Sequence, residues 1–444
     1  LMVSRFTYNK SSYNSTKSVK PGRGPTVEDM SDLWYDPRIL PYVCDDPAIN
    51  GSCQYQLAPG LIWCAEMNIL PTASRPLSEL ENYTKQSSGI FPHAKLAMES
   101  VATGKREDTK FNFTTGTVTH RNYIQKKAGL KAEFHHAYAA LIVEVDSNGD
   151  WWVRQLNADS RGGFYDCPRG GIGPLQIEDG EVIGGARAEA LNWGDVHASE
   201  IDPTVQGINW DKGGILDTLE PRLQFMHDLF SMRSRSHHDV LVYSKMLQKF
   251  FNGQDKVEDE LKTTTALMRI AHRDWCQMVV VSSNHDRHLD RWLDDCNFKV
   301  DLPNARFYLE AQLAHTLAQE KGEGWAALPW ALQRYDAPPA RYLPRDASFV
   351  ICGNAGGGIE CGWHGDEGPN GSRGSTKSLL KVGRRVNKGH DHTATIMDGV
   401  YSAGACSLDF SYAHGPSSHS VSHIVTWPNG KRCIITIRNG KWRA

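Results

Sequence analysis

The chain has 444 residues, of which 40% are hydrophobic and 23% are charged. This composition excludes a low-hydrophobicity disordered chain, and the length excludes one small module and suggests two or three compact units. Lysine and arginine total 49 against 51 aspartate and glutamate residues, so any polyanion must be held by local patches or ions rather than by a global positive field.

No apolar stretch approaches the roughly 20 residues that a membrane-spanning helix needs, and the chain opens without a secretory signal pattern. Its ten cysteines are scattered and none forms a CxxC pair, which is typical of reduced cytosolic proteins. We therefore expect a soluble cytoplasmic protein with no membrane partner.

The first half of the chain predicts two regions. Residues 1–30 are polar with little periodicity and are predicted as a flexible arm. Residues 31–183 are predicted as an N-terminal α+β accessory domain, with a helix over 94–101 and a hairpin of strands 137–145 and 151–156 around the turn residues 146–150. A glycine cluster at 169–174 lacks the context of a phosphate-binding loop and is interpreted as a plain loop.

From residue 184 to 444 short apolar strands alternate with amphipathic helices, which predicts an α/β layered architecture. Strands are predicted over 188–193, 223–227, 277–282, 348–352 and 359–363. Helices are predicted over 240–251, 257–275, 305–319 and 325–335. The Asn-Gly pair within 428–431 predicts a hairpin between strands 421–427 and 432–437.

Five segments of this second half place Asp, His or Asn directly after an apolar run. In open α/β sheets, ligand sites lie beyond the carboxyl ends of the strands. The ligand types are carboxylate, imidazole and amide without thiolate, which suits Mn, Fe, Zn or Mg. Each segment alone is a weak signal, but together they predict a metal site. The segments are Gly194-Asp195-Val196-His197, His227-Asp228-Leu229-Phe230, Ser283-Asn284-His285-Asp286, Gly362-Trp363-His364-Gly365 and Gly389-His390-Asp391-His392-Thr393.

This ordered set, which spans about residues 185–400, resembles the calcineurin-like metallophosphoesterases. The resemblance implies a four-layer α/β/β/α sandwich with two divalent metal ions, Mn²⁺ before Mg²⁺, Fe²⁺ or Zn²⁺. It implies that Asp195, His197 and His392 hold one ion. It also implies that Asn284, His364 and His390 hold the other, and that Asp228 bridges the two.

The chain departs from the family pattern beside the bridging aspartate. His227 stands where the family has glycine, and it is either a further site residue or a pocket wall. Asp239, which follows His237-His238, competes with Asp228 for the bridging role. A second departure, Ser283 for glycine before Asn284, has little consequence.

His285 and Asp286 are the predicted catalytic residues. His285 matches the non-ligand histidine of the family, and it would polarise a phosphate oxygen or protonate the leaving alkoxide. Asp286 either orients His285 or caps the helix that follows.

Residues on two segments beside the proposed ligands are of the types that contact phosphates. Asn370, Ser372 and Arg373 follow His364, while Arg384 and Arg385 lead into His390. Surface loops and solvated helix faces have the same composition, so this alternative stays open. Residues 362–374 and 132–136 also resemble the pre-early nucleases with which tailed phages degrade host DNA, which implies an Mn-dependent DNase in the bacterial cytoplasm.

The leading prediction is a two-metal phosphodiesterase that hydrolyses DNA, in which metal-activated hydroxide attacks phosphorus. A phosphomonoesterase or small-molecule phosphodiesterase of the same fold is the second prediction, and the near-neutral charge mildly favours it. A non-catalytic phage scaffold or inhibitor protein is the third. A homo-oligomer is compatible with the sequence, which does not define subunit number, native metal or exo- versus endonuclease action.

Overall fold

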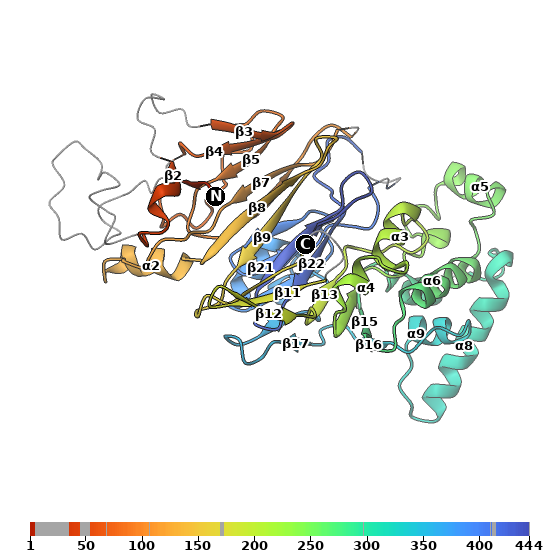
Figure 1. Ribbon diagram of the computed structural model, residues 1–444. Coiled ribbons are helices and arrows are strands. Elements are labelled where there is room, and N and C mark those ends of the chain that lie inside the picture. Colours follow the sequence, from red (N-terminus) through yellow and green to blue (C-terminus); the bar gives the residue numbers. More distant parts are fainter. Residues whose placement is uncertain are drawn as a thin grey trace.

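The computed structural model describes residues 1–4, 35–44, 54–67, 69–105, 107–168, 173–295, 297–408, 410 and 414–443. These ranges form a mixed α/β structure around two large sheets, so the predicted α/β class is confirmed. Helices α5, α6, α8 and α9 gather on one side of the molecule, and strands β3 to β5 lie on the other (Figure 1). Most of the predicted arm and residues 169–172 of the glycine cluster lie outside the described ranges.

The first large sheet has six strands in the order β16-β15-β14-β13-β22-β23. Strands β13 to β16 pair in parallel, while β22 and β23 add an antiparallel hairpin. Both faces of this sheet are covered, and its central strands are accordingly apolar runs without alternation, such as Met278–Val281. The strands are β13 (Ala190–Asn192), β14 (Leu223–Met226), β15 (Gln277–Val281), β16 (Arg341–Leu343), β22 (Ser422–Thr426) and β23 (Arg432–Thr436).

Helices cover one face of the six-stranded sheet and form the larger core with it. Helix α3 shows how local sequence sets a boundary, since the Asp202 carboxylate accepts hydrogen bonds from the backbone N–H groups of Thr204 and Val205. The helices are α3 (Pro203–Trp210), α4 (Ile215–Leu219), α5 (Tyr243–Phe251), α6 (Val257–Ala271), α7 (His288–Asp295), α8 (Ala305–Glu320) and α9 (Ala327–Gln333). Among these, α5 has no buried residue and projects from the body. The predicted strands and helices of the second half are confirmed, most with shorter limits.

The second large sheet has ten strands in the order β17-β18-β19-β21-β20-β6-β7-β5-β4-β3. Strand β20 pairs with β6, so segments from both halves of the chain form one sheet and share one core. The predicted accessory region, 31–183, is therefore continuous in structure with the region after residue 184. The strands are β3 (Gln54–Ala58), β4 (Leu61–Cys64), β5 (Ser88–Phe91), β6 (Met98–Val101), β7 (Lys110–Thr114), β17 (Val350–Ile351), β18 (Ile359–Glu360), β19 (Arg385–Lys388), β20 (Thr395–Met397) and β21 (Val400–Ser402).

The helix predicted over 94–101 is wrong. Residues Met98–Val101 form β6, which is hydrogen-bonded to β7 on one side and β20 on the other. The apolar spacing of this segment fits a helical period, but pairing with two neighbouring strands overrides that local preference.

Smaller elements complete the chain. The hairpin predicted from the turn at 146–150 is confirmed as β8 (Ala139–Val145) and β9 (Trp151–Asn157), and the hairpin predicted around 428–431 is confirmed as β22 and β23. At the start of the predicted arm, Val3–Ser4 form β1, which pairs with β2 (Val43–Cys44) from the region after the arm. The other elements are β10 (Phe164–Asp166), β11 (Leu175–Glu178), β12 (Glu181–Gly185), α2 (Lys127–His135), α10 (Thr376–Leu379) and the 3-10 turns η2 (Leu40–Tyr42), η3 (Arg233–Arg235), η4 (Leu302–Asn304), η5 (Pro369–Gly371) and η6 (Leu380–Val382).

The two large sheets pack face to face. Their apolar contact includes Phe225 and Val279 of the six-stranded sheet and Ile351 and Ile359 of the ten-stranded sheet. Helix α10 packs on the outer face of the ten-stranded sheet, where Leu379 contacts the Val386 and Val400 side chains.

A buried polar contact also joins the two sheets. The Asn387 amide on β19 donates to Asn192 Oδ1 on β13 at 2.9 Å and to Thr426 Oγ1 on β22 at 3.0 Å. Arg432, on β23, donates to Asn387 Oδ1 at 2.8 Å. Asn192 and Asn387 are both fully buried, so each side chain needs its partners to remain inside the protein.

In the described part of the chain, every helix is too short or too polar to cross a lipid bilayer. Seven cysteines whose side chains are described are free thiols: Cys64, Cys167, Cys276, Cys352, Cys361, Cys406 and Cys433.

We predict that Asn387→Leu lowers the free energy of unfolding by about 3 kcal/mol, because it removes the amide that donates to the buried Asn192 Oδ1 and the oxygen that accepts from Arg432. Urea unfolding followed by circular dichroism measures this change. Asn148→Leu, at the exposed turn between β8 and β9, is the matched control and should change the value by less than about 0.5 kcal/mol. Equal stability of the two variants would contradict the role given to the contact between the sheets.

Candidate metal centre

Asp195 and His197 lie just beyond β13, where the backbone continues as an extension of the sheet. Asp195 forms a parallel bridge with Ala405, and its N–H donates to the carbonyl of Gly404 at 3.0 Å. Residue 194 must be glycine, since a Cβ there would lie 2.8 Å from the backbone nitrogen of Ala405. The close approach of these two segments carries Asp195 into the interior, where it is fully buried.

Asp228 lies beyond β14 and is tied to the first segment by backbone hydrogen bonds. The N–H of Val196 donates to the carbonyl of His227 at 2.9 Å, and the N–H of His197 donates to the carbonyl of Asp228 at 2.8 Å. His197 and Asp228 both have φ of 46°, in the left-handed region that side chains other than glycine seldom occupy. His390 and His392 share this feature, with φ of 75° and 53°. Such strain persists only where surrounding structure enforces it, and it concentrates at functional sites.

Four of the predicted ligands form one buried group: Asp195, His197, Asp228 and His392 each offer an atom within 4.8 Å of the others. The Nε2 atom of His392 lies 3.1 Å from Asp195 Oδ2 and 3.2 Å from His197 Nε2. His197 Nε2 lies 3.6 Å from Asp228 Oδ2. Two carboxylates and two imidazoles in this arrangement can hold a divalent metal ion.

Asp195 is also the point at which the two large sheets meet at the site. The backbone N–H of His390, which follows β19, donates to both carboxylate oxygens of Asp195 at 2.8 and 3.1 Å. Residue 389 must be glycine for this contact, because a Cβ there would lie 2.1 Å from Asp195 Oδ1 and 2.9 Å from His227 Cβ. The loop that carries His390 and His392 is thereby held against the end of β13.

Of the second set of predicted ligands, His364 faces the other oxygen of the Asp228 carboxylate, and His390 lies beside His364. His364 Nε2 lies 3.4 Å from Asp228 Oδ1, and the His364 and His390 rings are 5.2 Å apart. The buried Oδ1 atom of Asn284 has no hydrogen-bonding partner among the described residues. A buried amide oxygen without a partner is costly, and a cation beside it would remove that cost. The Asn284 carbonyl and the His364 and His390 imidazoles are therefore of the types that bind a divalent ion.

Burial and charge give the site the protonation states that ligands need. Burial lowers the pKa of His197 to about 3 and also lowers the pKa of His390, which keeps these imidazoles neutral and able to bind a metal. The pKa of Asp228 stays well below its usual range despite burial, because His364 and His285 lie close to it. Burial opposes protonation of His364, but the Asp228 carboxylate raises the pKa of that imidazole to about 9. In the protein without bound ions, the Asp228–His364 pair is therefore the charged contact that a cation would displace.

Sequence reasoning missed the residues that orient the ligands. Ser231 Oγ lies 2.8 Å from His197 Nδ1 and turns the opposite nitrogen toward the other ligands. The ring of Phe410 packs against both His197 and His392, with centroids 5.2 and 4.7 Å away. Lys388, the last residue of β19, is fully buried and pairs with Asp391 at 2.7 Å. The sequence signal for Ser231 is its position three residues after Asp228. A serine in an apolar segment is too common to be predicted as a site residue on that basis.

The two predicted catalytic residues have different surroundings. His285 is half-buried, with its ring 4.9 Å from that of His197 and its buried Nδ1 atom without a partner among the described residues. Asp286 accepts hydrogen bonds from the Phe230 N–H at 2.8 Å and from Ser283 Oγ at 2.9 Å. Burial and the charge of Asp228 raise the pKa of Asp286 to about 7. Through these contacts Asp286 joins the loop after β14 to the loop after β15.

The structure separates the predicted substrate contacts from one another. Asn370, Ser372 and Arg373 are exposed on the loop that follows His364. Arg384 pairs with Glu360 at 3.3 Å, and the guanidinium of Arg385 donates to the carbonyls of Gly358, Gly430 and Ala355. Arg384 and Arg385 lie at the start of β19, whereas His390 follows its end. A role in substrate binding stays a prediction for all five residues.

The structure shows where Asp239 and His227 lie, the two residues for which the sequence left alternative roles open. Asp239 lies outside the ligand group and forms ion pairs with Lys245 at 2.6 Å and Lys249 at 2.8 Å, whereas Asp228 is inside the group. His227 is fully buried with its ring 5.6 Å from that of His364, and neither of its ring nitrogens has a partner among the described residues. Its position against Gly389 makes it part of the wall behind the loop that carries His390.

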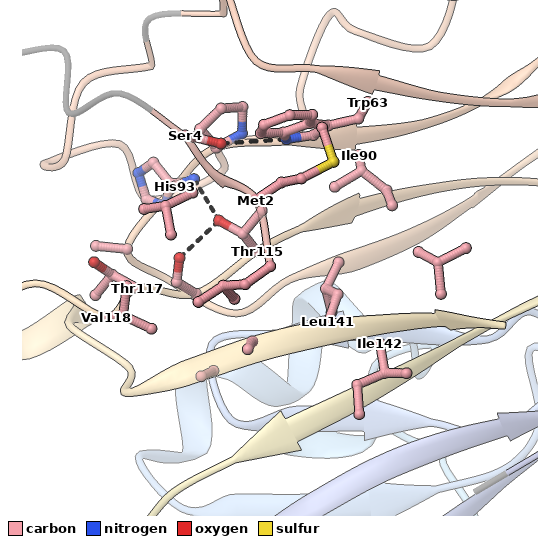
Figure 2. Close-up of a pocket in the computed structure, with 18 of the residues that line it drawn as sticks. Met2, Ser4, Trp63, Ile90, His93, Thr115, Thr117, Val118, Leu141 and Ile142 are labelled. Carbon is pink, nitrogen blue, oxygen red and sulfur yellow. Dashed lines mark hydrogen bonds between the residues drawn. The ribbon is translucent and has the colours of Figure 1, made fainter. Parts of the chain in front are cut away.

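A separate apolar cavity of about 680 Å³ lies between hairpin β8/β9 and strands β4 and β5. Figure 2 shows Trp63 and Ile90 on one side of it and Leu141 and Ile142 on the other. The hydroxyl of Ser4 accepts a hydrogen bond from the Trp63 indole at 3.2 Å, which holds the β1 segment at this cavity. No predicted ligand lines the cavity.

Comparison with known proteins gives one informative relative. The chain is 38% identical over 463 aligned residues to Protein A1 of Escherichia phage T5, an alignment that covers 100% of this chain and 77% of that protein. This similarity supports a phage origin. No protein-family model and no solved structure matches the chain.

We predict that Gly389→Ala weakens Mn²⁺ binding by about 10- to 100-fold, since the added methyl group must displace the Asp195 carboxylate or the loop carrying His390 and His392. Isothermal titration calorimetry measures the affinity. Gly324→Ala is the control, because a Cβ at that position meets no atom within 4 Å. Wild-type affinity in the Gly389→Ala protein would show that this loop does not build the site.

A second prediction concerns Asp239, which holds α5 against the loop that carries Asp228. Although burial opposes it, the ammonium groups of Lys245 and Lys249 lower the pKa of Asp239 from 3.8 to about 2. Its contribution to stability is therefore complete above pH 4 to 5 and is lost as the pH falls toward 2. We expect Asp239→Asn to cost about 1–2 kcal/mol at pH 7.

Urea unfolding at pH 7, 5 and 3 tests this expectation. The Asn variant should lose less stability than wild type between pH 5 and pH 3, because it lacks the carboxylate that becomes protonated. Parallel pH profiles for the two proteins would contradict the assignment.

Proposed function

Because the chain belongs to the family of Protein A1 of Escherichia phage T5, we propose that it is a two-metal phosphodiesterase that hydrolyses DNA in the host bacterial cytoplasm. The observation that carries this proposal is the position of Asp228. One oxygen of its carboxylate faces His197 in the first ligand group, and the other oxygen faces His364 in the second. A carboxylate shared in this way between two sets of nitrogen and oxygen ligands suits a bridge between two cations.

The architecture supports a metallophosphoesterase sandwich. Its layers follow the order helices, sheet, sheet and helix, and the candidate ligands all lie in loops that follow strands of the two central sheets. Asp195, Asp228 and Asn284 follow β13, β14 and β15, whereas His364 and His390 follow β18 and β19. This placement agrees with the rule that sites in α/β proteins form beyond the carboxyl ends of strands.

The chemistry divides between the ions and the chain. When bound, two divalent ions supply an activated water for attack on phosphorus and neutralise charge on the phosphoryl oxygens. The chain's own residues set the geometry: the His390 N–H fixes the Asp195 carboxylate, and Ser231 fixes the His197 ring. His285 is half-buried beside His197, and its Nδ1 atom has no partner among the described residues. In this proposal it donates a proton to the leaving oxygen.

DNA is the substrate class that the surroundings favour. The loop after His364 is exposed and carries Asn370, Ser372 and Arg373, residue types that bind a phosphate backbone. The sequence resemblance to phage nucleases and the relationship to a phage protein point in the same direction. A phosphomonoesterase or small-molecule phosphodiesterase of the same fold is the second candidate. A non-catalytic scaffold would have no need for a complete set of buried ligands around Asp228.

We expect the purified protein to degrade plasmid DNA with Mn²⁺, and Asp228→Asn to reduce the rate by a hundredfold or more because the variant loses the bridging charge. Gel assays with Mg²⁺, Mn²⁺, Zn²⁺ and Ca²⁺ identify the active metal. Asp274→Asn is the control, since the Asp274 carboxylate is fully exposed at the opposite end of β15.

Hydrolysis of p-nitrophenyl phosphate in place of DNA would favour the phosphomonoesterase. If neither substrate reacts with any of these ions, the scaffold or inhibitor function is the one that stands. Circular dichroism of each variant distinguishes loss of activity from loss of folding.

A further inference from the structure

A row of imidazole rings leads away from the metal centre. The His197 and His285 ring centroids lie 4.9 Å apart, and those of His285 and His288 lie 5.0 Å apart. The row continues from His288 to His237 at 4.5 Å and from His237 to His238 at 3.8 Å. Four histidines that are not candidate ligands therefore extend from the ligand His197 toward the surface.

Two elements hold these rings in place. His285 and His288 belong to the loop and first turn that open α7, while His237 and His238 lie between η3 and α5. The second segment is anchored by the ion pairs of Asp239 with Lys245 and Lys249. His237, His285 and His288 are half-buried and His238 is exposed, so one side of the row faces solvent.

The carboxylates nearest the row have other partners. Asp239 is paired with two lysines, and Asp286 accepts hydrogen bonds from Phe230 and Ser283. The buried Nδ1 atoms of His237, His285 and His288 have no hydrogen-bonding partner in the described ranges. Asp228, whose charge acts on His285 and His288, faces His197 and His364 with its two oxygens. The Nδ1 atoms of the row are therefore open to a ligand.

An anion fits this row better than a metal ion does. The compact ligand group in the described ranges comprises Asp195, His197, Asp228 and His392, and it includes none of the row's other members. Burial, His238 and Arg291 lower the pKa of His237, and burial lowers the pKa of His288 to about 3, so these imidazoles are neutral. The positive charge beside the row is that of the Arg291 guanidinium. Positive charge repels a cation and attracts a phosphate.

We propose that His237, His238 and His288 form a subsite for a backbone phosphate of the DNA strand adjacent to the scissile phosphodiester. This inference rests on the proposed function and names the part of the substrate that the chain grips. Successive charges of one DNA strand lie about 3.4 Å apart along its axis. We place the strand along the row, where its next phosphates would meet these imidazoles.

The test compares His237→Gln/His288→Gln with His272→Gln. His272 lies at the end of α6 that leads into the start of β15, so it is remote from the ligand loops. Binding of a short fluorescein-labelled DNA duplex is measured by anisotropy in Ca²⁺. Turnover is measured with DNA and with bis(p-nitrophenyl) phosphate, which has a single phosphodiester and no neighbouring phosphate.

For the double variant we expect about tenfold weaker DNA binding and about a tenfold fall in the ratio of kcat/KM for DNA to kcat/KM for bis(p-nitrophenyl) phosphate. The His272→Gln protein should match wild type. Unchanged DNA binding would overturn the proposal, as would an equal loss on both substrates, which would place the histidines at the scissile group.

Two further measurements separate the remaining explanations. In the first, inorganic phosphate competes with DNA for wild type and for the double variant. Equal competition would show that free phosphate binds elsewhere, and it would support a subsite for the DNA backbone. Loss of a bound Mn²⁺ from the double variant would identify the row as a cation site and overturn the proposal. If wild type hydrolyses neither substrate, the proposed function fails, and the anisotropy comparison still decides whether the row binds DNA.

Discussion

The candidate metal centre depends on the contact between two sheets. Asn192 on β13 and Asn387 on β19 are hydrogen-bonded in the interior, and three residues further along each segment the Asp195 carboxylate accepts the N–H of His390. The same pair of strands is thus joined twice, once by side chains in the core and once at the site. Ligands from the six-stranded sheet and ligands from the ten-stranded sheet can meet only while this packing holds.

The cost of assembling the site is visible in its backbone and its charges. His197, Asp228, His390 and His392 all have positive φ, and Asp195 and Asp228 bury two carboxylates beside each other. Without cations the Asp228 charge is balanced by His364, and the buried Asn284 carbonyl has no partner among the described residues. A divalent ion bound by this group would offset part of these costs.

Much of the site could be predicted because its residues follow strands, and strands were readable from apolar runs. Asp195, Asp228 and Asn284 follow β13, β14 and β15, whose hydrophobic patterns are unambiguous. The partners that depend on tertiary packing could not be predicted. Ser231, Phe410 and the buried Lys388 have no local sequence pattern that marks their roles. The sequence also does not show that the Arg385 side chain binds backbone carbonyls. The helix expected over 94–101 failed for the same reason, since β6 exists only because β7 and β20 flank it. That pairing joins the two halves of the chain, and their division at residue 183 stays a prediction.

We propose that Asp228 bridges two divalent ions held by ligands from both sheets. Crystals grown with Mn²⁺ and measured at the manganese absorption edge would show this bridge. Two anomalous peaks are expected on opposite sides of the Asp228 carboxylate, one beside Asp195, His197 and His392 and the other beside Asn284, His364 and His390. A single peak, or two peaks that do not share Asp228, would contradict it.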